Sequence, residues 1–138
     1  MEITDWPDYM PPRESWAEPF WGGLTDGKLM LPHCSQCKSY HYPPIEERCP
    51  KCTKPFSWVE SSGAARLWSW TTFHHGYFQN YPLGLPYTVL MVELDVSVKI
   101  LASLSTGESM SELKCDMEMA FQSMEIQSGV FIPAFSPV

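Results

Sequence analysis

The second half of the chain alternates apolar and polar residues in short runs, which predicts β-strands separated by turns. One long loop, residues 76–86, interrupts the series. The expected strands are residues 64–75, 87–95, 98–104, 116–121 and 129–135. Five short strands with one long loop are typical of a small closed barrel of the OB type.

The first part of the chain predicts little regular structure. Prolines are frequent over residues 1–13 and favour an extended segment, and Ser15 with Glu18 forms a capping-box pattern for a short helix that ends near Leu24. Apolar residues at helical spacing form one face of that helix: Trp16, Phe20, Trp21 and Leu24. We expect this face to pack on the domain, and a further contact with a ligand or another subunit stays open.

The cysteines carry the strongest motif. Cys34-x2-Cys37 and Cys49-x2-Cys52 are separated by eleven residues, a spacing that predicts two knuckles around one tetrahedral S4 metal site. Four cysteine ligands leave no open position for water or substrate, so the expected zinc is structural. Two disulfides are the alternative, which the reducing compartment expected for this chain disfavours. The fifth cysteine, Cys115, lies beside a Met-rich strand and is expected to be a small buried apolar residue. The alternative is a nucleophile, which would need a histidine close to it.

These elements predict a mainly β protein in three parts. Residues 1–30 form an N-terminal extension and helix, residues 31–58 a rubredoxin-like zinc ribbon with short strands at 28–32 and 56–60, and residues 59–138 a five-stranded OB-fold barrel.

Composition narrows the function. The chain has 9 basic and 16 acidic residues, a net charge of −7, and the barrel region holds only Arg66, Lys99 and Lys114 as bases, which argues against a phosphate-tracking surface. Aromatic residues make up 14%, and charged residues only 18%, which predicts an apolar partner surface. There is neither a signal-peptide pattern nor an apolar run of roughly 20 residues. We therefore expect a soluble cytoplasmic protein.

Motifs of catalysis are missing from the sequence. It contains no nucleophile elbow, P-loop, dinucleotide fingerprint or zinc-protease motif. His74 and His75 would face opposite sides of a strand, so at most one points to any given pocket. His33 and His41 flank the knuckles and are expected to brace them. The chain alone is not expected to be an enzyme.

Several short motifs, in order, resemble one known family. They are Pro19-Phe20-Trp21, Gly27-x-Leu29, the first knuckle, Tyr42-Pro43-Pro44, Cys49-Pro50-x-Cys52, Leu85-Pro86-Tyr87, Val92-Glu93-Leu94 and Ile132-Pro133-Ala134-Phe135. The chain resembles the acyl-CoA-associated proteins that join a rubredoxin-like zinc ribbon to an OB fold, known as domain of unknown function thirty-five. It departs from the family at Val96-Ser97, where Glu-Gly is usual, and at Lys114-Cys115-Asp116, where Ile-Gly-Met is usual.

The resemblance implies an accessory role. Such proteins pair with thiolase-superfamily enzymes that make or break carbon–carbon bonds on acyl or acyl-CoA substrates. The partner supplies the catalytic residues, while the OB protein bridges subunits and can help line the acyl channel. Candidates for contact with acyl-CoA or the partner are Trp21, Phe73, His75, Tyr77, Phe78 and Tyr87.

Two other functions stay open at this point. One is a free-standing acyl-CoA-binding protein or esterase. The other is an OB-fold nucleic-acid binder that stacks bases on Trp68, Trp70 and Phe73, which the acidic charge disfavours.

Overall fold

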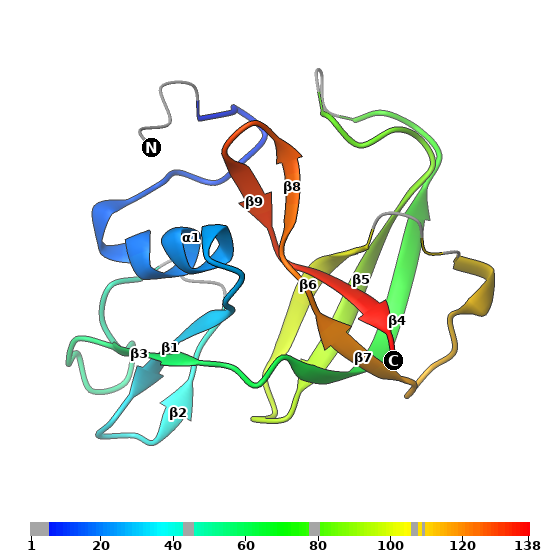
Figure 1. Cartoon of the computed structure of the whole chain (residues 1–138). Helices are drawn as coiled ribbons and strands as arrows, with labels where there is room; N and C mark the ends of the chain where they lie inside the picture. Colours follow the sequence, from blue (N-terminus) through cyan, green and yellow to red (C-terminus); the bar gives the residue numbers. More distant parts are fainter. Residues whose placement is uncertain (1–5, 43–45, 78–80, 106–107, 109) are drawn as a thin grey trace.

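A helix, a small ribbon and a closed barrel follow one another along the chain, as predicted (Figure 1). The structure is a computed structural model that describes residues 6–42, 46–77, 81–105, 108 and 110–138. The predicted mainly β class is confirmed. No helix in this described part of the chain is both long and apolar enough to cross a membrane.

The predicted helix is present, but its predicted cap is wrong. A 3-10 turn, η1 (Ser15–Ala17), leads into α1 (Glu18–Thr25), whose N-cap is Ala17 with no side-chain cap hydrogen bond. Glu18 does not reach back to Ser15, because Arg13 donates two hydrogen bonds to its carboxylate instead, one of them 3.0 Å long from Nε. Gly27, at φ 77°, ends the helical region in the left-handed conformation.

The ribbon is a three-stranded antiparallel sheet. Its middle strand, β1 (Met30–Cys34), pairs with β2 (Ser39–Tyr40) on one side and with β3 (Ser57–Glu60) on the other. The predicted strand at 28–32 is therefore displaced by two residues toward the first knuckle.

The barrel contains five strands in the order β10-β6-β5-β4-β7. Their bounds are β4 (Ala64–Phe73), β5 (Tyr87–Leu94), β6 (Lys99–Leu104), β7 (Glu118–Phe121) and β10 (Ala134–Pro137). A short 3-10 turn, η2 (Met110–Glu112), lies between β6 and β7. The first four strands match the predicted ones closely.

The fifth predicted strand, residues 129–135, is only partly right. The chain is divided at Pro133 into β9 (Val130–Ile132) and β10, and only β10 joins the barrel. β9 pairs instead with β8 (Met124–Gln127), a strand that the sequence did not predict, in a hairpin that rises between α1 and the barrel (Figure 1).

One hydrophobic core serves the helix, the ribbon and the barrel. Phe20 and Leu24 of α1 belong to the same buried cluster as Leu31 of β1 and the barrel residues. The barrel members include Leu67, Leu90, Val92, Ile100, Met119 and Phe135. Trp16, on the predicted helix face, packs against this cluster half-buried. The domain boundaries expected from the sequence, at 30/31 and 58/59, stay predictions.

A β-bulge in β4 changes which side chains face the core. Leu67 pairs with Val92 and Ser69 with Met91, so Trp68 is an extra residue on β4. Before the bulge Leu67 points inward, whereas after it Trp70 does, opposite the fully buried Leu90. Trp68 and Phe73 therefore do not share a face with Trp70, and the three aromatic residues form no single stacking platform.

The turn between β5 and β6 explains one departure from the family pattern. Ser97, at φ 64°, donates its N–H to the Leu94 carbonyl at 2.9 Å, and Leu94 donates to Val98 at 2.8 Å. This is a three-residue hairpin loop whose last residue is left-handed, a position that favours glycine. The backbone geometry of the turn thus persists without the glycine.

We expect Ser97→Gly to stabilise the protein by roughly 0.5–1 kcal/mol. Relief of the left-handed conformation is worth about 1–2 kcal/mol, and the extra backbone freedom of glycine in the unfolded chain removes part of that gain. Urea unfolding of the variant measures the difference. Ser97→Ala keeps the strained backbone and is the control, so an equal gain for both variants would contradict the interpretation.

Candidate metal centre and aromatic site

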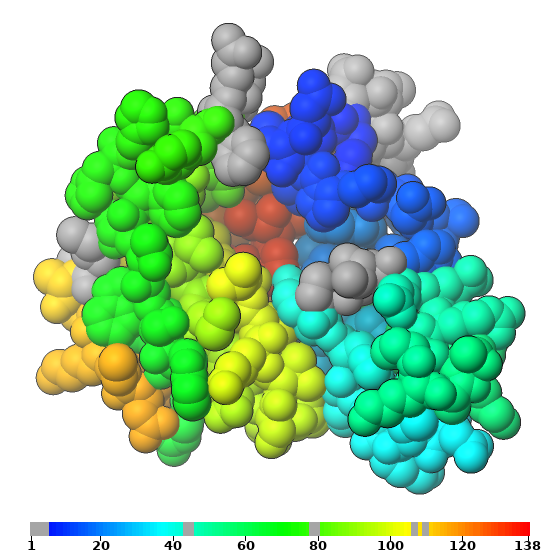
Figure 2. Space-filling model, turned by 180° about the vertical axis from the view of Figure 1, so that it is seen from behind, coloured from blue at the N-terminus to red at the C-terminus, as the bar shows by residue number. Residues whose placement is uncertain are grey.

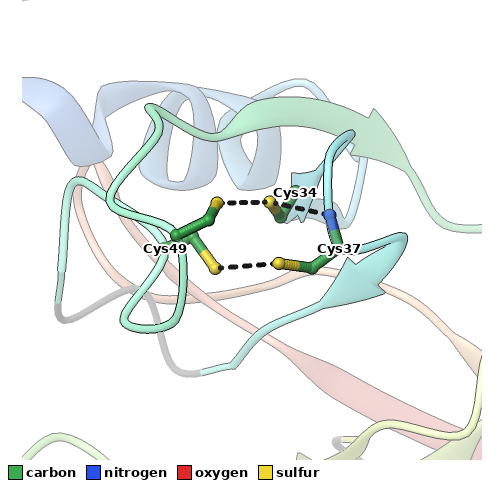
Figure 3. Close-up of side chains that lie close together, drawn as sticks. Cys34, Cys37 and Cys49 are labelled. Carbon is green, nitrogen blue, oxygen red and sulfur yellow. Dashed lines mark hydrogen bonds between the residues drawn. The ribbon is translucent and has the colours of Figure 1, made fainter.

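The four paired cysteines converge on one point. Their Sγ atoms all lie within 4.8 Å of one another, with Cys34 and Cys52 3.4 Å apart and Cys37 and Cys49 3.9 Å apart (Figure 3). A tetrahedral zinc ion with Zn–S bonds of about 2.3 Å separates its sulfur ligands by about 3.8 Å. The cluster therefore fits a tetrahedral S4 site.

Two similar loops position these sulfurs. Cys34 ends β1, and the backbone N–H of Cys37 donates to its Sγ at 3.3 Å. Residues in the left-handed region follow both knuckles, Lys38 at φ 56° and Thr53 at φ 63°. Each loop thus reverses immediately after its second cysteine, which turns both pairs of sulfurs toward the same point.

The electrostatics of the cluster favour a cation. The N–H of Cys37 lowers the pKa of the Cys34 thiol to about 7, whereas hydrogen bonds to the other cysteines, Cys52 foremost, and burial raise the pKa of Cys37 to about 12. Ionisation of one thiol therefore opposes ionisation of its neighbours, and a divalent ion among the sulfurs would neutralise part of their negative charge. Four bases in this region, Lys38, Arg48, Lys51 and Lys54, would offset the negative charge that remains when four thiolates bind one divalent ion.

The neighbouring histidines pack beside the knuckles. The His33 ring lies 4.6 Å from that of Tyr40, and the His41 ring 4.8 Å from that of Phe56. His41 Nε2 also lies 2.9 Å from the Ser39 hydroxyl. Among the described residues, the metal-ligand cluster contains the four cysteines and neither histidine.

Cys115 differs from its expected environment. It is exposed rather than buried, and it lies outside the four-sulfur cluster. The reason is local: it precedes Asp116, whose φ of 68° turns the chain sharply before β7. This turn coincides with the second departure from the family pattern.

Aromatic rings join the long loop to the rest of the molecule. Phe73 and Tyr87, paired across β4 and β5, stack with ring centroids 5.1 Å apart and planes 4° from parallel. Tyr77 meets Phe73 edge-on at 6.0 Å, and His75 meets Tyr77 at 5.1 Å. Four of the six candidate contact residues are thus neighbours.

The other two candidates are not part of this group. Trp21 is buried in the core against Phe20 and Trp6, with ring centroids 4.9 and 5.0 Å away. Phe78 lies outside the described residues.

Two tyrosines that the sequence did not single out extend the group. Tyr81 lies 5.1 Å from Tyr87, and Tyr9 lies 5.0 Å from Tyr81. The Tyr9 hydroxyl donates to Gln127 of the β8–β9 hairpin at 2.5 Å. We call the series Tyr77, Phe73, Tyr87, Tyr81 and Tyr9 the aromatic ladder. It connects the N-terminal segment at Tyr9 to the stretch from Phe73 to Tyr87, so only a weak sequence signal existed, the frequency of tyrosine itself.

A cavity of about 380 Å³ opens beside the ladder. Tyr87 lines it together with hydroxyl residues, Glu108 and aliphatic side chains, and its described lining contains no Lys or Arg. The hydroxyls belong to Thr72, Thr88, Ser103 and Ser105. Within the described part of the chain, the Ser105 Oγ is buried without a hydrogen-bond partner. This site suits a neutral ligand with an apolar body and a few polar atoms.

Comparison with known protein families identifies both halves of the fold. Residues 21–55 match the rubredoxin-like zinc ribbon domain of ChsH2, and residues 58–122 match the C-terminal OB-fold domain of ChsH2. The protein is thus of the class that joins a zinc ribbon to an OB-fold barrel. Since the two matches together cover well over half of the chain, it belongs to the ChsH2 family, also called DUF35.

Solved structures share this fold. An aldolase described as Ltp2-ChsH2(DUF35) aligns with a TM-score of 0.80 at 22% identity, covering 93% of this chain and 98% of the other. A DUF35 protein of unknown function from Sulfolobus solfataricus aligns with a TM-score of 0.58 at 17% identity, covering 90% and 86%. The comparison with curated proteins found no match.

We expect Tyr9→Phe to release the N-terminal segment. The variant removes the hydrogen bond to Gln127, worth about 1 kcal/mol, and keeps the ring contact with Tyr81. Hydrogen exchange of residues 6–13 should become several-fold faster. Tyr40→Phe is the matched control, because the Tyr40 hydroxyl makes no hydrogen bond within the described residues; equal exchange in both variants would contradict the assignment.

Proposed function

We propose that the protein is a non-catalytic accessory subunit of a thiolase-like multienzyme complex that makes or breaks carbon–carbon bonds on acyl or acyl-CoA substrates. The observation that carries the proposal is the likeness over nearly the full length of both chains to the ChsH2 component of an aldolase, together with the membership of the same family. In this role the chain bridges subunits in the cytoplasm, and the partner enzyme supplies the catalytic residues.

The cysteines of the chain support this division of labour. Four of them are committed to one cluster, and the fifth, Cys115, is exposed and makes no hydrogen bond within the described part of the chain. A nucleophilic cysteine needs a base or another group that lowers its pKa. The proposal therefore assigns the chemistry to the partner.

The cluster of Cys34, Cys37, Cys49 and Cys52 holds one structural zinc ion in this proposal. The sulfur spacing and the match to a zinc ribbon domain support it. A closed S4 site supplies folding energy rather than catalysis, because a ribbon of this size has few apolar side chains of its own to bury.

The aromatic ladder and the adjoining cavity form one side of the acyl channel in this proposal. Tyr87 lines the cavity, and Phe73, Tyr77 and His75 continue from it through successive ring contacts. Phe78 lies outside the described residues, so its part in the channel stays a prediction. Because the described lining lacks cations, the cavity suits the acyl group or an uncharged arm better than the phosphates of CoA. Trp21 contributes only indirectly, through the core.

The accessory role predicts a specific partner. Affinity capture of the tagged protein from its native cells at low salt, read by mass spectrometry, should recover a thiolase-fold enzyme in near-stoichiometric amount. The enzyme expressed alone should be less stable or less active than the complex. Recovery of the chain alone, or a fully active and stable lone enzyme, would contradict the proposal.

The structural zinc predicts a sharp effect of one substitution. Cys49→Ser should lose most of the bound zinc and unfold the ribbon, since three thiolates leave a strained, open site. Metal analysis and thermal unfolding measure the loss. Cys115→Ser is the matched control and should keep one zinc per chain, whereas an unchanged zinc content in Cys49→Ser would refute the assignment.

A further inference from the structure

The outward side of strands β4, β5 and β6 carries exposed apolar side chains. Trp68 is 53% exposed and Leu101 is 55% exposed, and the partly exposed Met91 pairs with Leu101 across β5 and β6. We call this surface, centred on Trp68, Met91, Lys99 and Leu101, the outer sheet face. Figure 2 views the molecule from this side, with the green of β4 next to the yellow-green of β5 and β6.

The bulge in β4 is what brings Trp68 to this face. The Lys99 Nζ lies 3.8 Å from the centre of the Trp68 indole, although Lys99 is on β6 and Trp68 on β4. Since β5 runs between these two strands, the indole must lie across β5 to reach Lys99. A bulge that turns a large aromatic residue into solvent contributes nothing to the core, and bulges of this kind commonly re-aim a side chain for function.

Charge distinguishes this face from the rest of the molecule. The chain has a net charge of −7, but β4, β5 and β6 contain a single acidic residue, Glu93, against Arg66 and Lys99. Arg66 approaches Asp116 and Glu118 at 3.9 Å, whereas Lys99 makes no ion pair within the described residues. Glu93 lies opposite Lys99 across β5 and β6, but the Lys99 ammonium lies over the Trp68 indole and forms no ion pair with the Glu93 carboxylate. An apolar centre with such a cation fits an apolar surface that carries an acidic group.

Strand β6, which carries Leu101, is held in place by a contact with the segment that follows the ribbon strand β2. Tyr42, in the segment that follows β2, donates its hydroxyl to the Leu101 carbonyl at 3.4 Å, and its ring contacts Phe20 of α1. Burial raises the pKa of the Tyr42 hydroxyl, so it stays a donor over the physiological range. The face is therefore built on a rigid strand, and residues on rigid elements make effective binding anchors.

We propose that the outer sheet face is the docking surface for the enzyme subunit of the complex, with Trp68 and Leu101 as anchors and Lys99 paired to a carboxylate of that subunit. The inference rests on the proposed function and adds to it the surface and the chemistry of the partner. A second copy of this chain fits less well, because two molecules of charge −7 repel each other.

The test measures binding of the purified thiolase-fold enzyme that is recovered with the wild-type chain. Trp68→Ala and Leu101→Asp should each weaken its affinity by about 30-fold or more, as expected for central anchors. Lys99→Glu should weaken it about tenfold, mainly through slower association, and the loss should shrink at high salt. Lys28→Glu makes the same charge change at an exposed residue between α1 and β1, outside this face, and should have little effect.

Three outcomes overturn the docking surface. If all three variants keep their zinc and melting temperature and bind within about threefold of wild type, the enzyme docks elsewhere while the accessory role stands. If no thiolase-fold enzyme is recovered with the wild-type chain, the proposed function fails and this inference fails with it. If sedimentation shows a wild-type dimer that Trp68→Ala dissociates, a second copy covers the face. If a variant fails to fold, hydrogen exchange of the wild-type complex tests the docking surface instead. Amide exchange in β4–β6 should be slower in the complex than in the free chain.

Discussion

The rest of the structure depends on burial of α1 against β1 of the ribbon and β9 of the hairpin. The ribbon offers few apolar side chains of its own. Phe20 and Leu24 join it to one buried cluster that also contains the barrel residues Leu67 and Leu90. That packing fixes how the ribbon sits on the barrel and so places Tyr42 against β6. The order of the ribbon and the position of β6 are consequently linked through one set of contacts.

Alternation along the sequence was sufficient to predict most of the barrel, because each strand has one buried and one exposed face. It failed where a tertiary contact outweighed the local pattern. Residues 129–135 divide at Pro133, since the first half pairs with the unforeseen β8 rather than with the barrel. The capping box failed because Arg13 occupies the carboxylate of Glu18. The bulge at Trp68 was also invisible, because an alternation pattern cannot show that one residue has no partner across the strand.

The candidate sites divide in the same way. The metal site could be predicted because all four ligands and their spacing lie within a short stretch of sequence, and the geometry of the sulfurs agrees with it. The aromatic site could be predicted only in part. Phe73 and Tyr87 face each other across paired strands and Tyr81 lies in the loop between them, whereas Tyr9 joins them from the distant N-terminal segment. Cys115 was expected to be buried from its residue type alone, and the sharp turn at Asp116 exposes it.

Trp68, the extra residue of β4, bears on how this fold differs among relatives. Without Trp68, β4 and β5 would pair without interruption from Ala65 to Phe73, since the register on either side of it is regular. A chain shorter by that one residue would keep the inward and outward positions of the remaining strand, but it would lose the bend and extra twist that a bulge gives to a barrel strand. The bulge and the indole thus have separate consequences, because the extra residue curves β4 whatever its side chain is. Among relatives, the residue type at this position is therefore free to follow what each chain assembles with.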